Sequence, residues 1–274
     1  MLVSKKELTN LKLGSIKSND LRELAAILDV DLRGKSSDLI KKLIDAPQDK
    51  IDEFIKGKYE ELIRERQKLI SDNDLRQELS KVKDFRWGVV QGQLDSKIQS
   101  EYVRHFVRYE DLLNGVRTRL HDDITHYVIA TWYNHWTTVL IEDHISKHPK
   151  VIPTLKNKLG VDIFFDYQPF DLKTTYLPKS FTLEQALKSP KDLIIWLYEN
   201  QGAQRFGADN RFFVVLASKS NLDESWKLKR DFDFVFNEID KFFESASVSK
   251  EDEVVFGFDQ KTYTTISKIL IIAK

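Results

Sequence analysis

The stretch from residue 160 to residue 175 constrains the fold most strongly, because it contains two short apolar strands joined by a turn. The segment 161–165 is rich in β-branched and aromatic residues, and the segment 166–169 carries residues that are typical of turns. The next strand then folds back beside the first one. This pattern predicts a β-hairpin within an α/β fold.

Charged side chains occupy one face of the second predicted strand. Asp171 and Lys173 lie two positions apart, so their side chains point to the same side. Phe170 and Leu172 alternate with them and point to the opposite, buried side. The predicted hairpin also brings Asp162 close to Asp171. Two carboxylates and one ammonium group are thus expected to meet a single substrate.

These three groups suit a magnesium-dependent site that acts on a phosphodiester. Mg²⁺ prefers oxygen ligands and is commonly held by one or two protein carboxylates together with substrate phosphate. A lysine beside it can orient or deprotonate the attacking water, or stabilise charge that develops on the phosphoryl oxygens. We therefore expect Mg²⁺ as the cofactor.

An acid, a variable gap and then acid-any-lysine on the next strand form the signature of the PD-(D/E)XK nuclease superfamily. In this chain the signature reads Asp162 and then Asp171-Leu172-Lys173, and the chain resembles the superfamily at these residues. The resemblance implies a restriction-endonuclease-like fold, with a mixed central sheet flanked by helices. It also implies that Asp162, Asp171 and the Leu172 carbonyl hold Mg²⁺, and that Lys173 lies beside the attacking water.

Two other acids bear on this assignment. The superfamily often adds a glutamate from the helix before the first strand, and Glu142 stands in the apolar run where that helix is expected. The resemblance makes Glu142 a further catalytic and metal-binding candidate. Asp166 competes with Asp162 for the role of the first acid, because no proline precedes Asp162. The sequence leaves this choice open.

Composition sets the broad class of the protein. The chain has 274 residues, of which 41% are hydrophobic, enough for a sizeable core. Lys and Arg together number 43, as do Asp and Glu, so any DNA affinity must come from local patches. Cysteine is absent, which excludes disulfides and thiolate chemistry. With no signal sequence and no uncharged apolar run that could span a bilayer, we expect a cytoplasmic protein without a membrane partner.

The first 50 residues read as a small helical module. Apolar residues at helical spacing predict helices over about 18–28 and 36–44, separated by a loop that contains Gly34 and Lys35. This helix, loop and helix arrangement resembles the SAP motif, which contacts DNA in many chromatin and repair proteins. The resemblance implies phosphate contacts by Arg33, Gly34, Lys35 and Ser36. A packing or dimerisation module is the alternative for this segment.

Further elements are expected downstream. Helical spacing predicts helices over 101–147, 180–187, 189–199 and 231–243, and a short continuous apolar run predicts a buried strand over 211–216. Residues 262–273 read as a final strand or short helix. The polar segment before residue 211 carries side chains that can pair bidentately with adenine or guanine edges, namely Gln201, Gln204, Arg205 and Asn210.

We therefore expect three parts: a SAP-like helical module (1–50), a charged helical linker and loop (51–94), and a nuclease domain (95–274). The expected function is a Mg²⁺-dependent type II restriction endonuclease that cleaves double-stranded DNA as a homodimer. Such an enzyme is paired with a DNA methyltransferase that acts on the same site. Two alternatives stay open: a repair or recombination nuclease that reads DNA structure, and a noncatalytic SAP-type DNA-binding protein.

Overall fold

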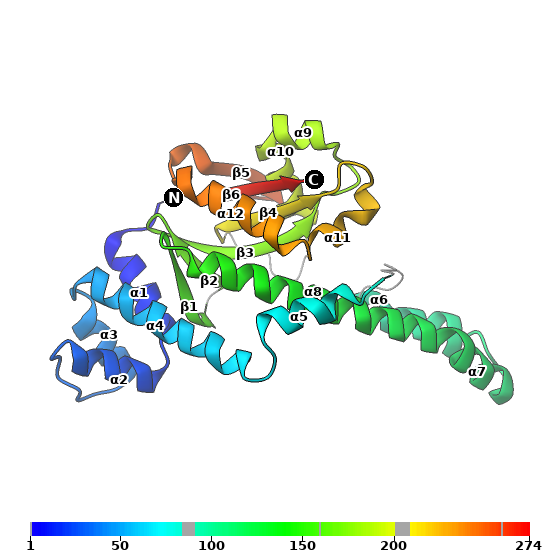
Figure 1. Cartoon of the computed structure of the whole chain (residues 1–274), viewed down its shortest axis with the longest axis horizontal. Helices are drawn as coiled ribbons and strands as arrows, with labels where there is room; N and C mark the ends of the chain where they lie inside the picture. Colours follow the sequence, from blue (N-terminus) through cyan, green and yellow to red (C-terminus); the bar gives the residue numbers. More distant parts are fainter. Residues whose placement is uncertain (1, 84–90, 159, 201–208, 259) are drawn as a thin grey trace. The chain divides into compact units, whose positions relative to one another are not determined.

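The computed structural model describes residues 2–83, 91–158, 160–200, 209–258 and 260–274. Contacts between residues divide the chain into two compact units (Figure 1). One unit consists of residues 1–69 together with residues 141–274, and the other consists of residues 70–140. The N-terminal helices and the sheet belong to the same unit, and the expected division at residues 50 and 94 stays a prediction.

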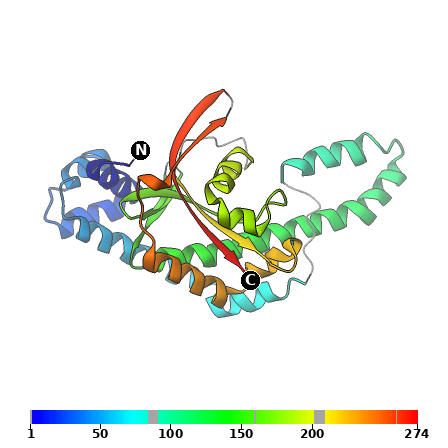
Figure 2. The same ribbon diagram turned by 90° about the horizontal axis from the view of Figure 1, so that it is seen from above.

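A six-stranded mixed sheet forms the centre of the larger unit, with strand order β1-β2-β3-β4-β6-β5. Strands β3, β4 and β6 run parallel, and the pairs β1-β2, β2-β3 and β5-β6 are antiparallel. Figure 2 shows β5 and β6 as a long two-stranded ribbon. The expected mixed sheet flanked by helices is therefore confirmed. The strands are β1 (Val151–Lys158), β2 (Val161–Phe165), β3 (Gln168–Tyr176), β4 (Arg211–Ala217), β5 (Glu253–Phe258) and β6 (Lys261–Ala273).

Helices cover both faces of this sheet, which explains why every residue of β4 is buried. On one face, α9 (Leu183–Lys188) and α10 (Pro190–Asn200) pack against the strands, with Leu193 beside Phe213 in one apolar cluster. On the other face, α12 (Phe232–Ser245) brings Phe242 and Phe243 within 5.3 Å and 5.5 Å of the Phe212 ring. The short helix α11 (Ser225–Leu228) precedes α12. The predictions for β4 and for α9, α10 and α12 are confirmed, whereas α11 was not predicted.

The predicted hairpin is formed by β2 and β3, and its turn contains only two residues. Asp166 has a φ of 45° and Tyr167 a φ of 62°. Positive φ at both central positions is typical of a type I′ turn, whose twist matches that of the flanking strands. The turn is shorter than the predicted segment 166–169, because Gln168 already pairs with Phe165.

Four helices form the N-terminal part of the larger unit: α1 (Lys5–Ser15), α2 (Ser18–Ile27), α3 (Ser36–Leu43) and α4 (Gln48–Gln67). Their fully buried leucines, among them Leu13, Leu24 and Leu39, share one core with Leu155 of β1. The expected helices over 18–28 and 36–44 are confirmed. Because this core includes Leu155, the four helices and the sheet share a hydrophobic core.

Helix α4 corrects one expectation about the linker. The sequence predicted a charged helical linker here, yet Ile51 and Ile55 on one face of the helix are completely buried. On the same helix, Tyr59 donates a hydrogen bond to Asp143 at 2.9 Å, and Arg66 forms an ion pair with Asp143 at 3.0 Å. The charged residues occupy the remaining faces, so composition alone concealed the narrow apolar stripe.

The smaller unit, described by itself, is entirely helical among the residues with a described structure. It contains α5 (Asp72–Ser80), α6 (Gln91–Ile98), a π-helical turn (99–103), α7 (Tyr109–Gly115), a second π-helical turn (116–120) and the first part of α8 (His121–Lys147). Lys97 of α6 pairs with Asp123 of α8 at 2.6 Å. The expected helices over 101–147 are confirmed, apart from a break at residues 104–108. Across the described ranges, no helix is long and apolar enough to span a membrane.

Candidate active site

The hairpin brings the two predicted strand acids together. Beyond Phe170, β3 no longer pairs with β2 and instead pairs with β4, starting at Asp171. The carboxylate of Asp162 fills the gap in the β2-β3 ladder, because its Oδ2 accepts a hydrogen bond from the Leu172 N–H at 2.9 Å. The N–H and C=O of one strand residue face the same neighbour, so the Leu172 carbonyl also faces the side of Asp162.

Asp171 and Lys173 lie on the predicted common face and form an ion pair, with 2.7 Å between Asp171 Oδ1 and Lys173 Nζ. The intervening Leu172 is buried on the opposite face, as the alternation predicts. The two partners differ in solvent exposure, since the side chain of Lys173 is 39% exposed and that of Asp171 only 12%. The lysine can therefore reach a ligand from solvent while the aspartate stays in place.

Burial and mutual repulsion make the acids reluctant to ionise together. Burial raises the pKa of Asp162 to about 6; the nearby Asp171 carboxylate raises it as well, whereas the hydrogen bond from the Leu172 N–H opposes the shift. Glu142 projects from the last turns of α8, and burial followed by repulsion from Asp162 raises its pKa to about 7. Lys173 and Lys229 oppose the shift of Glu142. The structure thus places Glu142 within the electrostatic reach of the hairpin site.

Three charged residues that sequence reasoning missed join this cluster. Arg211, at the start of β4, pairs in register with Asp171 and lies 3.5 Å from its Oδ2. Asp209 lies just before β4, and burial and the charge of Asp171 raise its pKa. Lys229 follows α11, and burial lowers its pKa to about 8 although Glu142 opposes the shift. A charged residue at the head of an apolar strand could have indicated Arg211; nothing local indicates Lys229.

The donor set fits Mg²⁺ through its chemistry. Asp162 and Asp171 crowd two negative charges into one buried place, and a divalent cation between them would relieve their repulsion. Among the described ranges, no cluster of three or more carboxylates and histidines is close enough to hold a metal ion. Two protein carboxylates suffice for Mg²⁺ when substrate phosphate and water complete its shell. Glu142 is therefore a neighbour of this pair and not part of a preformed three-acid ligand set.

Of the two candidates for the first acid, only Asp162 lies beside Asp171. Asp166 occupies the hairpin turn, four residues farther along the chain, and its Oδ2 accepts a hydrogen bond from the Val248 N–H at 2.6 Å. Its carboxylate is thereby committed to the segment that follows α12. Asp162, rather than Asp166, is therefore the acid that lies within reach of Asp171.

Of the candidate DNA-contacting residues of the N-terminal module, Arg33, Gly34 and Lys35 lie on the exposed loop between α2 and α3, and Ser36 is the first residue of α3. Arg33 has a side chain that is 92% exposed and pairs with Asp31 at 3.0 Å. Arg33 and Lys42 lower the pKa of Asp31 to about 2. Gly34 has a φ of 114°, which favours glycine. Lys35 is exposed, whereas the Ser36 hydroxyl is bonded to that of Ser18 at 2.9 Å.

Most of the candidate base-reading residues, namely Gln201, Gln204 and Arg205, lie outside the described residues. The fourth, Asn210, has a structural contact, because its Oδ1 accepts a hydrogen bond from the Ile266 N–H at 2.9 Å. Its backbone carbonyl also accepts one from the Asp171 N–H at 2.9 Å. Asn210 therefore ties β6 and β3 to the start of β4.

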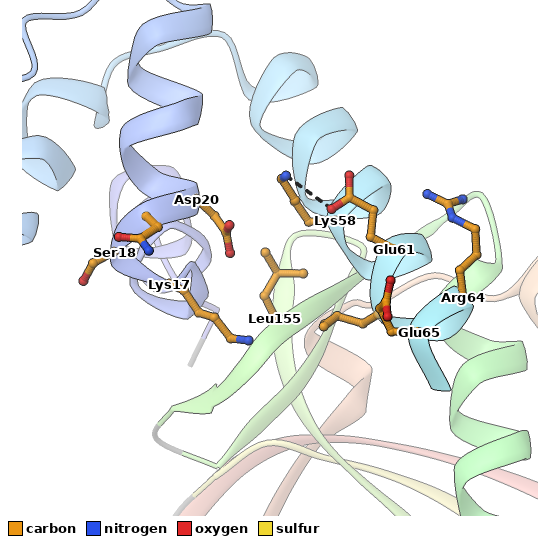
Figure 3. A pocket seen from close by; sticks show the side chains of 10 residues that line it. Lys17, Ser18, Asp20, Lys58, Glu61, Arg64, Glu65 and Leu155 are labelled. Carbon is orange, nitrogen blue, oxygen red and sulfur yellow. Dashed lines mark hydrogen bonds and ion pairs between the residues drawn. The ribbon is translucent and has the colours of Figure 1, made fainter. Parts of the chain in front are cut away.

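A cavity of about 550 Å³ lies away from the acids, between the start of α2, the second half of α4 and β1 (Figure 3). Its wall mixes both signs of charge, with Lys17, Lys58 and Arg64 near Asp20 and Glu61. In Figure 3, Lys58 and Glu61 are joined by an ion pair of 3.3 Å. The lining includes none of the hairpin acids, so this cavity belongs to a different part of the unit.

The chain was compared with known protein families, sequences and structures. No protein-family model, no curated protein sequence and no solved structure matches the chain.

Proposed function

We propose that this chain is a Mg²⁺-dependent endonuclease of the type II restriction class, with a restriction-endonuclease-like fold, that hydrolyses phosphodiester bonds in double-stranded DNA. The observation that carries the proposal is the adjacency of Asp162 and Asp171 on paired strands, with Lys173 on the same face as Asp171. Two carboxylates and a partly exposed lysine are the groups that such a reaction requires.

The chain's own residues divide the work. Asp162, Asp171 and the Leu172 carbonyl would hold Mg²⁺, with Glu142 behind them. When bound, Mg²⁺ supplies a Lewis acid that activates water and neutralises charge on the phosphate. Lys173 exchanges its ion pair with Asp171 for a contact with the scissile phosphate or the attacking water. Because Asp171 is largely buried, its carboxylate stays within the site during this exchange.

DNA recognition is proposed to come from two regions. The loop with Arg33, Gly34, Lys35 and Ser36 would contact backbone phosphates, and the segment before β4 would read base edges through Gln201, Gln204, Arg205 and Asn210. We propose a homodimer, because two-fold symmetry of the protein matches a palindromic site. A DNA methyltransferase of the same specificity would protect the host genome in the cytoplasm.

Incubation of the purified chain with unmethylated plasmid and phage DNA tests the proposal. We expect discrete fragments in the presence of Mg²⁺ and intact DNA in the presence of EDTA. A Mg²⁺-dependent smear would contradict sequence specificity and would favour a nuclease that reads DNA structure. Intact DNA under all conditions, in protein that still binds DNA, would favour the noncatalytic binding protein.

The double substitution Arg33→Ala and Lys35→Ala is expected to weaken DNA binding without changing the cleavage rate at saturating DNA. Each lost phosphate contact reduces the magnitude of the slope of log K against log salt concentration by about one. The two substitutions together should therefore reduce it by about two. Fluorescence anisotropy at several salt concentrations measures this change. Lys5→Ala with Lys6→Ala removes two exposed lysines of α1 and serves as the matched control. An unchanged slope in the loop variant would show that the module contacts something other than DNA.

A further inference from the structure

Asp171 has two cationic partners of different character. Lys173 holds Oδ1 at 2.7 Å, and 39% of its side chain is exposed. Arg211 lies 3.5 Å from Oδ2, and its side chain is only 8% exposed. One partner can therefore leave for a ligand, whereas the other is enclosed by protein.

Neighbouring elements fix the guanidinium of Arg211. Its central carbon lies 4.7 Å from the centre of the Tyr198 ring, a cation–π distance. The Tyr198 hydroxyl is hydrogen-bonded to Ser267 Oγ at 2.8 Å and to the Asp209 carbonyl at 2.9 Å. Arg211 also pairs in register with Asp171 on one side and with Ser267 on the other. The guanidinium thus lies against Tyr198 of α10, on the same face of the sheet as Asp171.

The contact between Arg211 and Asp171 is incomplete in this structure. At 3.5 Å it is too long for a good hydrogen bond, and the buried Arg211 Nε has no hydrogen-bond partner among the residues that the structure describes. A buried N–H group without a partner is costly, so a nearby carboxylate that becomes free will be drawn to it. The lysine now holds that carboxylate on its opposite oxygen.

We propose that Arg211 is a positioning residue that takes over Asp171 when Lys173 turns to the substrate. This inference rests on the proposed function. The carboxylate shifts slightly, Arg211 Nε–H donates to Oδ2, and Oδ1 becomes available. Arg211 thereby keeps the Asp171 carboxylate oriented at the moment when its first partner leaves. The arginine itself does not touch the substrate.

Kinetics of Arg211→Gln and Arg211→Lys test the role in cleavage. For Arg211→Gln we expect kcat to fall about 100-fold, the effect typical of a misplaced catalytic group, with KM for DNA changed less than about twofold. Arg211→Lys keeps the charge and should restore part of the rate. Arg64→Gln, on an exposed arginine of α4, is the matched control. If wild type cleaves and Arg211→Gln cleaves as Arg64→Gln does, the inference is wrong while the proposed function stands.

A measurement that needs no activity tests the exchange of partners directly. In ¹⁵N-labelled protein, the Arg211 Nε–H group should be rigid, with an order parameter of about 0.8 or more. Lys173→Ala removes the competing partner, so the Nε–H proton should shift downfield as its hydrogen bond to Asp171 forms. Adding Asp171→Asn should diminish that shift. An Nε–H signal as mobile as that of Arg64, or unmoved by Lys173→Ala, would overturn the inference even in a protein that cleaves no DNA.

Discussion

Lys173→Ala is expected to lower the single-turnover rate of DNA cleavage by at least about 1000-fold. Loss of one group that stabilises the transition state typically costs 100-fold to 1000-fold, and Lys173 is proposed both to orient the water and to neutralise the phosphate. Binding should change less than about threefold, because one lysine is a small part of the total phosphate contact. Rapid-quench cleavage and anisotropy binding separate these two quantities.

The fold of this variant should be intact, because Lys173 is partly exposed and its partner Asp171 can turn to Arg211. Lys179→Ala, in the loop after β3, is the matched control, since its side chain is 83% exposed and also pairs with an aspartate, Asp223. Asp171→Ala should abolish cleavage as well. Full cleavage by Lys173→Ala or by Asp171→Ala would refute the assignment of this hairpin as the active site.

The hairpin could be predicted because its signals are local. Alternation fixes the faces of Asp171 and Lys173, and a two-residue turn fixes which strand residues oppose each other. Since Phe165 pairs with Gln168, Asp162 must come opposite Asp171. The two acids and the lysine could therefore be predicted because they are close together in the sequence. The gap between Asp162 and Asp171 was still long enough to leave Asp166 as a second candidate for the first acid.

Elements with weak or interrupted patterns could not be predicted. Strand β1 contains Pro153, which is tolerated because β1 is an edge strand, and its register with β2 shifts between Pro153 and Lys158. Helix α4 carries so many charged residues that its segment was expected to be a linker, and the burial of Ile51 and Ile55 on one of its faces was not predicted. In both cases tertiary packing decided what local propensity left ambiguous.

Arg211, Asp209 and Lys229 were missed for a different reason. They reach the site through parallel pairing and helix packing across separations of about 40 residues or more, and no spacing rule links such residues in a single sequence. The register Asp171↔Arg211 follows only once β3 and β4 are known to be neighbours. The charged neighbours of the acids can thus be predicted only when the strand order and helix packing are known, whereas the acids of the hairpin can be predicted from local sequence spacing.

Asp162→Asn is expected to abolish cleavage and, at pH 7 without Mg²⁺, to raise the free energy of unfolding by about 1–2 kcal/mol. Burial and the nearby Asp171 carboxylate raise the pKa of Asp162 to about 6, so the ionised form is disfavoured in the fold. A shift of about two units corresponds to roughly 3 kcal/mol, which we reduce because the side chain is only partly buried. Asparagine keeps an oxygen to accept the Leu172 N–H bond without the charge.

The sign of the pH dependence follows from the raised pKa. The folded protein binds the Asp162 proton more firmly than the unfolded chain does, so the charge penalty is absent below about pH 4 and complete above about pH 6. The advantage of Asp162→Asn should therefore grow over this window and stay constant above it. Denaturant unfolding at pH 4, 5, 6 and 7 measures it.

Mg²⁺ provides the decisive contrast between wild type and Asp162→Asn. A cation bound at the acid pair offsets the repulsion and stabilises the folded wild type by mass action, so millimolar Mg²⁺ should raise its free energy of unfolding at pH 7. The variant, with one ligand charge removed, should gain little. Asp166→Asn, on the same hairpin, is the control. Its side chain also keeps an oxygen that can accept the hydrogen bond from the Val248 N–H, and this variant should show no gain in stability without Mg²⁺. An Asp162→Asn protein that is less stable than wild type at pH 7, or that responds to Mg²⁺ as wild type does, would mean that the two carboxylates do not form a strained cation-binding pair.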